Sequence, residues 1–525
     1  LDFADTSDIG KDVSGNSNDF TPNNFVAADV IPDSPTLNYA TMNKIDGPTF
    51  SSAFGNLRVN GSSSSAGSIG STFFPTTGKW YVEMVAEDMG NGMSVGIKSD
   101  NEGTFWKPTR GKSVIYQSDG NKIIDGGSAT SYGATYTVGD IIGLKINLDD
   151  GIIEFLKNNA SQGNASTALT SGVAFGVFFL DTSSSNNARS QFNFGQDSSF
   201  RNTVTSGSAD ASDANGHGDF YYSVPSGYLA LNSANLPEPT ITPLDDDIPE
   251  DYFNTVLYDG ASAIVNVTGV GFSPDFLWLK RRNASSTNHK ILDTVRGSGQ
   301  ALESNNTGSE SDESANFSSF DSDGFTLANV GAGAYNVNGG TFVSWNWLAG
   351  TAFSNDASAT SVGTIDSSGQ VNTKAGFSII SYTGAGSTET VAHGLSSAPE
   401  IVLHKNRTDA ADWEFITTVI DGSVDFLRFT TAGKGDSSRT APTSTVFQIG
   451  SSANQGASGK NYIAYCFHSV DGYSKFGSYT GNGSTGGTFV YTGFRPAFVI
   501  IKQTSASGNN WNVHDNKRGS PNEAD

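Results

Sequence analysis

The side chains of this sequence that could do chemistry are carboxylates close together in the chain, such as Asp321 with Asp323 and Asp412 with Glu414. Paired carboxylates can cleave glycans, one acting as general acid and the other as nucleophile or base. That chemistry depends on the distance between the two carboxyl groups in space, which sequence spacing does not give. We therefore expect no catalytic residues and no enzymatic activity, with a glycan depolymerase as an alternative.

Metal-binding patterns are weak. No two of the six histidines have the His-x-x-x-His spacing, and Cys466 is the only cysteine, so neither a zinc site nor an internal disulfide is expected. The alternation of Asp12, Ser14, Asn16 and Asn18 resembles a calcium loop but lacks the closing glutamate. We expect a hydrogen-bonded turn there and no cofactor, with a structural calcium ion as the alternative.

The loop from Asn101 to Asp125 is the candidate ligand-binding site. Its aromatic, basic and amide side chains are Phe105, Trp106, Arg110, Tyr116 and Asn121. Aromatic faces beside amides and hydroxyls suit sugar rings or a partner protein. The alternative is that Trp106 and Tyr116 only cover the edge of a sandwich.

Length and composition indicate an all-β, multidomain protein. A chain of 525 residues is too long for one core, and short alternating runs bounded by Gly, Asn, Asp and Ser occur throughout. The net charge of −23 argues against binding to nucleic acid or anionic lipid, because both need basic surface. No apolar run is long enough to cross a membrane, so we expect no membrane insertion.

Residues 46–236 are predicted to form an antiparallel β-sandwich. Trp80, Val82 and Met84 alternate along one strand, and Asp150-Gly151 between two alternating runs is a hairpin signal. The order of several short motifs resembles the SPRY/B30.2 family, a concanavalin-like sandwich. These motifs are Gly78-Lys79-Trp80-Tyr81-Val82-Glu83, Val95-Gly96-Ile97, Gly139-Asp140-Ile141-Ile142-Gly143, Leu148-Asp149-Asp150-Gly151 and Phe192-Asn193-Phe194-Gly195. The resemblance implies a non-catalytic binding module whose ligands meet the loops at one end.

One motif of Tyr, Gly, Pro, an apolar run and Lys occurs three times. Its members are Tyr258, Gly271, Pro274 and Lys280; Tyr382, Gly394, Pro399 and Lys405; and Tyr479, Gly493, Pro496 and Lys502. A period of roughly a hundred residues is too long for a solenoid and indicates small domains in series. In each copy the Gly before Pro is expected to make a tight turn, and the apolar run after Pro a buried strand.

The domains follow from these patterns. We predict β-sandwich repeat 1 at 251–350, repeat 2 at 374–471, and the start of repeat 3 at 472–525. An extended N-terminal connector at 1–45, a Pro/Asp-rich linker at 237–250 and a Ser/Ala-rich connector at 351–373 would join independent domains. Because the chain starts without Met and stops inside the third copy, we expect a piece of a longer polypeptide.

A second recurring feature is Asp293 with Arg296, which returns as Asp515 with Arg518. Repeat 2 has Thr417 and Ile420 at roughly those positions. A site needed in every copy would not be dropped from one, so the pair is predicted to be a salt bridge that fixes a turn.

The repeats resemble those of tailed-bacteriophage fibre and spike proteins. The motifs behind this resemblance are Asp293-Thr294-Val295-Arg296-Gly297, Phe320-Asp321-Ser322-Asp323-Gly324-Phe325 and Val224-Pro225-Ser226-Gly227-Tyr228-Leu229-Ala230-Leu231-Asn232. The resemblance implies a non-enzymatic, extracellular virion protein, a tail fibre or spike segment that mediates host attachment. Its implied partners are itself as a homotrimer, other virion proteins and a host surface glycan or protein. A capsid-decorating head fibre and a secreted bacterial adhesin are the alternatives.

Overall fold

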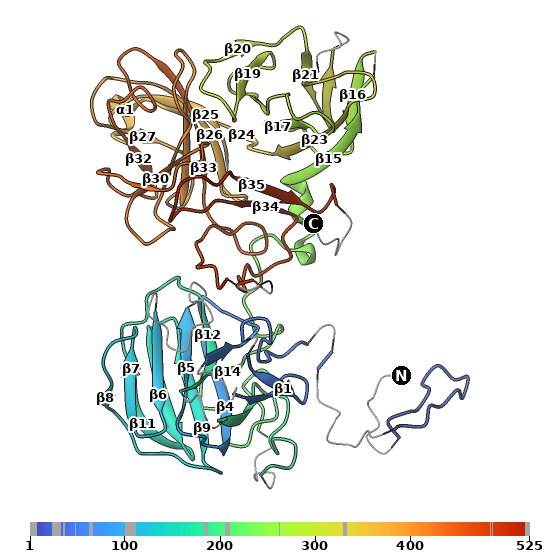
Figure 1. The fold of residues 1–525 in the computed structure, drawn as a ribbon, viewed down its shortest axis with the longest axis vertical. Helices are drawn as coiled ribbons and strands as arrows, with labels where there is room; N and C mark the ends of the chain where they lie inside the picture. The colour runs from blue at the N-terminus through green and yellow to red at the C-terminus, as the bar shows by residue number, and fades with distance from the viewer. Residues whose placement is uncertain are drawn as a thin grey trace. The chain divides into compact units, whose positions relative to one another are not determined.

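The computed structural model describes residues 8–23, 33–34, 37–47, 49–61, 67–99, 112–182, 187–204, 211–261, 263–328, 333–483, 485 and 487–519. Within them the elements are strands, apart from the short helix α1 (Ala357–Thr360) and the 3-10 turns η2 (Pro243–Asp245) and η3 (Pro249–Asp251) (Figure 1). None of the described helices is long and apolar enough to span a membrane. The predicted all-β, multidomain fold is confirmed.

The chain divides into two compact units. Unit 1 comprises Leu1–Pro237 and Tyr479–Gly493, and unit 2 comprises Glu238–Ser478 and Phe494–Asp525. The main division falls where the sequence predicts the Pro/Asp-rich linker to begin.

Unit 1 is a sandwich of two antiparallel sheets. One sheet has the order β1 (Ser51–Ala53), β2 (Arg58–Asn60), β13 (Arg189–Asn193), β4 (Lys79–Asp88), β9 (Ile141–Asn147), β10 (Ile152–Lys157) and β11 (Ala160–Ser166), and β14 (Leu229–Ala230) adds a parallel pairing to β4. The other has the order β3 (Gly67–Gly70), β12 (Phe175–Asp181), β5 (Met93–Ser99), β6 (Ser113–Gln117), β7 (Asn121–Ile124) and β8 (Thr130–Ser131).

The core of unit 1 lies between these sheets. Trp80, Val82 and Met84 of β4 are buried in one cluster with Val95 and Ile97 of β5, as the alternation of the sequence predicts. Part of the predicted N-terminal connector also belongs to this unit, because Tyr39 and Met42 form isolated bridges to Asn232 and Ser71 and residues 39–42 are mostly buried. That segment is short and bridges singly, so it leaves little alternation in the sequence.

Repeat 1 of unit 2 is a sandwich with a large and a small sheet. The large sheet has the order β15 (Phe253–Asp259), β23 (Thr341–Trp347), β17 (Phe276–Arg281), β18 (Lys290–Asp293), β19 (Gln300–Glu303) and β20 (Ser311–Asp312). The small sheet has the order β16 (Val265–Thr268), β22 (Gly324–Leu327) and β21 (Phe317–Asp321).

Repeat 2 has the same strand order in six strands of its large sheet and adds two strands at one edge. Its large sheet runs β24 (Thr351–Asn355), β25 (Ser367–Asn372), β26 (Phe377–Thr383), β33 (Asn461–Phe467), β28 (Ile401–Asn406), β29 (Glu414–Thr417), β30 (Asp425–Arg428) and β31 (Gly435–Asp436). Its small sheet pairs β27 (Glu389–Ala392) with β32 (Val446–Ile449). Strands β24 and β25 occupy the stretch 351–373, where the sequence predicts a connector.

The third copy contributes β34 (Phe498–Ile501) and β35 (Asn512–Asp515), which pair antiparallel as β17 with β18 and β28 with β29 do. The register agrees in the first and third copies, because Phe276 lies opposite Asp293 and Phe498 lies opposite Asp515.

Both faces of the central strands of each large sheet are buried, which explains the continuous apolar runs of these strands. In β17, Leu277 and Leu279 face the core of repeat 1, whereas Phe276 and Trp278 lie in a second cluster. We call this second cluster the shared core, because it also holds residues of β26, β28, β29 and β33, with β34 and β35 packed against it. The repeats therefore differ from the independent domains expected on stiff connectors.

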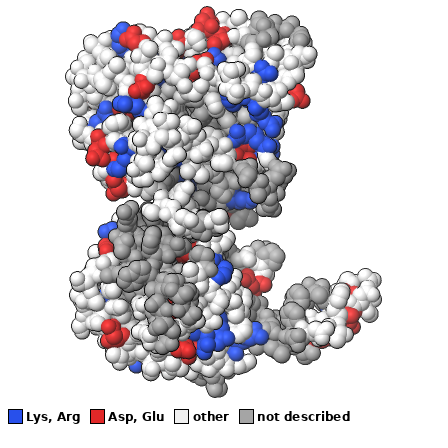
Figure 2. Space-filling model, in the orientation of Figure 1, with Lys and Arg blue, Asp and Glu red and all other residues white. Residues whose placement is uncertain are grey.

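The described residues on the face shown in Figure 2 include few charged side chains. On the face shown in Figure 2, acidic and basic side chains are interspersed, and most described residues are neither. This agrees with the 16% of charged residues in the sequence, which leaves hydroxyl and amide groups to make most of the polar surface.

Candidate functional site

The recurring tyrosine has a structural place in the first two copies. Tyr258 stacks on Phe342 with ring centroids 4.9 Å apart, and Tyr382 stacks on Tyr462 at 5.3 Å. Each hydroxyl donates to a backbone carbonyl of its own repeat. Tyr479 of the third copy is exposed instead.

The recurring glycine and proline shape the turn before the strand. Gly271, Gly394 and Gly493 all have positive φ, at 89°, 74° and 82°, which favours glycine. Pro274, Pro399 and Pro496 each stand two residues before the first residue of β17, β28 and β34. The glycine turn and a strand after proline are present in all three copies, and this strand is mostly buried in β17 and β28 but half-buried in β34.

The recurring lysine ties its strand to the following loop. Lys280 donates from Nζ to the carbonyl of Thr287, Lys405 to that of Ala411 at 2.5 Å, and Lys502 to that of Asn509 at 2.5 Å. Burial lowers the pKa of Lys405 to about 8. Each of these amines bonds to a carbonyl of its own copy, so the motif lysine fixes the loop that follows its strand.

The Asp–Arg pair fixes a turn, as predicted from the sequence. Arg296 Nε lies 2.5 Å from Asp293 Oδ2 and its Nη2 donates to the carbonyl of Ile291 at 2.9 Å. Arg518 binds Asp515 at the same 2.5 Å and donates to the carbonyl of Val513. The two Asp–Arg pairs, which we call clasps, thus make the same bonds.

Each clasp also receives a hydrogen bond from another repeat. Tyr465 of repeat 2 donates to Asp293 of repeat 1 at 2.6 Å. Trp345 of repeat 1 donates from Nε1 to Asp515 of the third copy at 3.0 Å. Tyr465 and Trp345 are both the fifth residue of equivalent strands, β33 and β23. Equivalent hydrogen bonds therefore link repeat 2 to repeat 1 and repeat 1 to the third copy.

A second pair of equivalent hydrogen bonds also links the third copy to repeat 2. Trp413 of repeat 2 donates from Nε1 to the carbonyl of Glu303 in repeat 1, and Trp511 of the third copy donates to that of Arg428 in repeat 2, both at 2.8 Å. Glu303 and Arg428 are the last residues of equivalent strands, β19 and β30. Within unit 2, repeat 1, repeat 2 and the strands β34 and β35 of the third copy thus contact one another cyclically around the shared core.

The carboxylates Asp321 and Asp323 are engaged in local bonds. Asp321 accepts the hydroxyls of Ser319 at 2.7 Å and Thr326 at 2.6 Å. Asp323 accepts backbone N–H groups of Gly269 and Gly271. Both carboxylates hold strand ends and turns of repeat 1.

The pair Asp412 and Glu414 belongs to a charged cluster at the side of repeat 2. Glu414 is buried between Arg428 at 3.5 Å and Arg439 at 3.4 Å, and it also accepts amides of Asn454 and Gln455. Asp412 contacts Arg428 at 3.5 Å.

At the equivalent position of repeat 1, the central side chain is basic and its partners are acidic. There Lys290 lies between Glu303 at 2.6 Å and Glu313 at 2.8 Å. Because the register makes Lys290 equivalent to Glu414, the two repeats put inverted charges at one position. The position needs a paired charge in both copies, and the residue type that supplies it differs.

The predicted ligand loop is only partly within the described residues. Phe105, Trp106 and Arg110 lie outside them. Tyr116 lies in β6 and is fully buried, with its ring against Phe155 and its hydroxyl donating to a backbone carbonyl. Burial raises its pKa to about 12. Its assignment to a ligand surface was therefore wrong, because alternation along β6 turns it into the core.

Asn121, the other described member of that set, begins β7. Its side-chain amide donates to Asp119 at 2.9 Å, which holds the turn between β6 and β7. The structure therefore does not bring Tyr116 and Asn121 together on one exposed surface.

The stretch that resembles a calcium loop is a hydrogen-bonded turn. Asp12 accepts the backbone N–H of Ser14 at 2.8 Å with one carboxylate oxygen and that of Asn18 at 3.0 Å with the other. Asn16 donates to the hydroxyl of Ser14. In the described part of the chain, no three His, Cys, Asp or Glu side chains gather as metal ligands.

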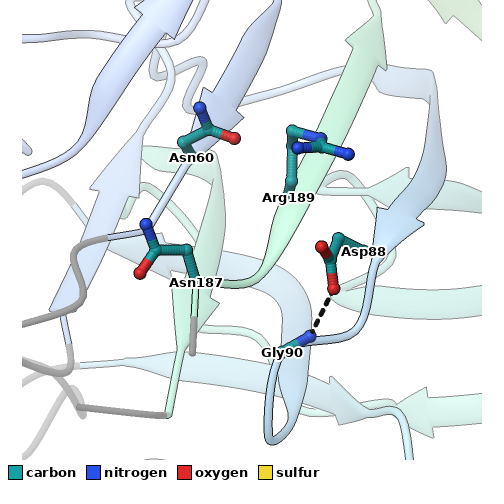
Figure 3. Close-up of a pocket in the computed structure, with 5 residues that line it drawn as sticks. All are labelled: Asn60, Asp88, Gly90, Asn187 and Arg189. Carbon is teal, nitrogen blue, oxygen red and sulfur yellow. Dashed lines mark hydrogen bonds between the residues drawn. The ribbon is translucent and has the colours of Figure 1, made fainter. Parts of the chain in front are cut away.

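An open polar pocket at the edge of unit 1 was not predicted from the sequence. Its volume is about 410 Å³, and its lining is Asn60, Asp88, Gly90, Asn187 and Arg189 (Figure 3). Arg189 of β13 lies opposite Asn60 of β2 on one side and Asp88 of β4 on the other. Residues more than a hundred positions apart meet through this pairing, so no local sequence signal marks the site.

The pocket is held by bonds just behind its wall. Glu87, whose side chain is 6% exposed, accepts Nε of Arg58 at 2.7 Å and Nε of Arg189 at 2.8 Å. Asp88 accepts the backbone N–H of Gly90 at 3.1 Å with Oδ1. These contacts fix the guanidinium and the carboxylate that face the pocket.

Two family models match the chain. The model described as "Domain of unknown function (DUF7483)" matches residues 248–525, and the SPRY domain model matches residues 78–197. The second match confirms the SPRY resemblance of the first sandwich.

Several solved structures are similar to part of this chain. The SPRY domain of human HERC1 is 15% identical, with 31% of this chain and 96% of that chain covered at a TM-score of 0.24. A human SPRY domain is 16% identical, with 27% of this chain and 94% of that chain covered at a TM-score of 0.23. The TRIM65 PSpry domain is 12% identical, with 30% and 90% covered at 0.24.

Proposed function

The chain belongs to the family described as "Domain of unknown function (DUF7483)", and we propose that it is a non-enzymatic structural protein of a virus particle. It forms a segment of a bacteriophage tail fibre or spike and mediates attachment to the host surface. Its place is the virion, outside the cell. Its partners are other virion proteins, further copies of itself and a host glycan or protein.

The proposal rests mainly on what the recurring residues do. Lys280, Lys405 and Lys502 bond to carbonyls of their own loops, and the two Asp–Arg clasps bond to protein atoms. What the chain repeats is therefore a framework of internal bonds. A repeated framework suits a protein that holds and displays surfaces, as a fibre does.

The attachment part of the proposal comes from unit 1. A SPRY-type sandwich is a binding module by resemblance, and its described surface includes an open polar pocket. The acidic net charge of −23 keeps such a protein soluble and disfavours binding to nucleic acid.

Adsorption of the purified chain to bacterial cells tests the proposal. Fluorescently labelled protein should bind host cells saturably, and an excess of unlabelled protein should slow adsorption of the virus. Cells resistant to the virus through loss of a surface glycan or receptor serve as the control. Equal binding to both cell types would contradict attachment.

Incubation with host capsular or lipopolysaccharide glycan tests the non-enzymatic part. We expect no release of reducing ends. Release that disappears in the variant Glu414→Gln, while the fold is retained, would overturn that part of the proposal.

A further inference from the structure

We propose that the polar pocket formed by Asn60, Asp88, Gly90, Asn187 and Arg189 binds a neutral sugar through its hydroxyl groups. This rests on the proposed function, because it gives the attachment surface a ligand class. The site lies in unit 1 and is separate from the loop that the sequence marked as a candidate.

The pocket offers hydrogen-bonding atoms that no described residue uses. Arg189 is bound to Glu87 through Nε only, so both terminal nitrogens lack a partner among the described residues. Asp88 uses Oδ1 for Gly90 and keeps Oδ2 open, again within the described part of the chain. Asn187 is exposed and its amide makes no bond to a described residue.

These atoms are a balanced set of donors and acceptors. The guanidinium supplies donors, the carboxylate oxygen accepts, and the amide of Asn187 does both. Each hydroxyl of a sugar also donates and accepts. Neighbouring hydroxyls on one ring can therefore satisfy Asp88 and Arg189 together, as the side chains face one space in Figure 3.

Charge balance favours a neutral ligand over an anionic one. Arg58 and Arg189 are matched by Glu87 and Asp88, which leaves the pocket and its supporting bonds without net charge. A phosphate or carboxylate ligand would approach Arg189 but would meet the carboxylate of Asp88 beside it.

The size and rigidity of the pocket also fit. A volume of about 410 Å³ lies within the range of small-molecule sites. Arg189 and Asp88 are on paired strands, and Glu87 fixes the guanidinium from behind. A site held in this way loses little side-chain freedom when a ligand binds.

Saturation-transfer NMR on the whole chain tests the proposal, with glucose, galactose and mannose as neutral probes and glucuronate as the charged comparison. We expect transfer to at least one neutral hexose and a weaker response to glucuronate. The variant Asp88→Asn should weaken binding about tenfold, because it replaces a charged acceptor. The variant Asn187→Ala should weaken it less, since it removes one neutral amide.

The matched control is Asp150→Asn, which changes an exposed carboxylate of the same unit that pairs with Lys79 outside the pocket. It should leave sugar binding unchanged. Asn187 makes no bond to a described residue, so Asn187→Ala keeps the test valid should Asp88→Asn fail to fold. No transfer to any neutral hexose, stronger binding of glucuronate, or equal binding by wild type and both pocket variants would overturn the proposal.

The same variants separate this inference from the proposed function. Adsorption to host cells that persists in both variants, with no sugar binding by the wild type, would refute the pocket and leave attachment standing. Sugar binding that both variants weaken, with no adsorption to host cells, would support the pocket and refute attachment.

Discussion

At the scale of single residues, Glu83 is a carboxyl group buried in the interior of unit 1. It accepts the backbone N–H groups of Tyr221 at 2.8 Å and Tyr222 at 2.9 Å, and also contacts Tyr81 and Asn193. Burial raises its pKa to about 7 in spite of these bonds. The carboxyl group of Glu83 therefore holds a proton more tightly in the folded protein than in the unfolded chain.

A pH dependence of stability follows. The contribution of Glu83 is complete below its unfolded pKa of 4.5 and is lost as pH rises through about 7. Between about pH 5 and about pH 8, unit 1 should lose at most about 3 kcal/mol of its free energy of unfolding. Thermal unfolding at several pH values measures this.

The control for this prediction is Glu83→Gln, which keeps an acceptor oxygen without a titrating group. It should flatten the pH profile in that range. A profile that is unchanged by the substitution would assign the pH dependence to other groups.

Residue roles were predictable from the sequence where a motif recurs. The Asp293–Arg296 clasp could be inferred because it returns as Asp515–Arg518 and is missing from repeat 2. Tyr116 was misread because it was grouped with aromatic loop residues. Side chains on β6 alternate between the two faces of the sheet, so Tyr116 lies on the same buried face as Val114.

At the scale of elements, the two clasps make a matched pair for mutation. The Arg296 side chain is 0% exposed and that of Arg518 is 28% exposed. The substitution Arg296→Ala leaves Asp293 buried without its cation and should lower the free energy of unfolding of unit 2 by about 3–5 kcal/mol. Arg518→Ala should cost less, because water reaches that pair. Denaturant unfolding compares the two.

The comparison has a clear contrary result. If both substitutions change stability equally, burial does not set the strength of the clasp. If neither changes it, the pair does not fix the turn.

Strands could be predicted from the sequence where one or both of their faces are buried. Strands whose residues are mostly exposed could not. The stretches β24 and β25 consist largely of Ser, Thr, Asn, Gln and Gly, and most of their residues are exposed or half-buried. Polar strands at the edge of a sheet leave no hydrophobic alternation, so the sequence favoured a connector there.

At the scale of the whole molecule, the shared core should make the repeats of unit 2 unfold together. The substitution Tyr382→Phe removes a buried hydroxyl that donates to the carbonyl of Gln455 at 2.7 Å, within repeat 2. It should cost about 1–3 kcal/mol. The hydrogen-exchange rate of the slowest amides should then rise by a similar factor in β28 of repeat 2 and in β17 of repeat 1.

Independent repeats would give another pattern. Exchange would rise in β28 while β17 kept its protection. That result would restore the picture of separate domains in series and would contradict the shared core.

The shared core and the pocket could not be predicted from the sequence, because both depend on contacts between residues far apart in the chain. A continuous apolar run shows that both faces of a strand are buried, but the partner of the second face depends on how the repeats pack. The pocket likewise depends on the pairing of β2, β13 and β4, which brings distant residues together.

The central claim is that this chain is part of a virus particle and meets the host. Electron microscopy of virus particles labelled with gold-tagged antibody against the chain tests it most directly. We predict gold on a fibre or spike that projects from the particle. Particles without gold, together with labelled chain on the surface of uninfected bacteria, would contradict the account and favour a bacterial adhesin.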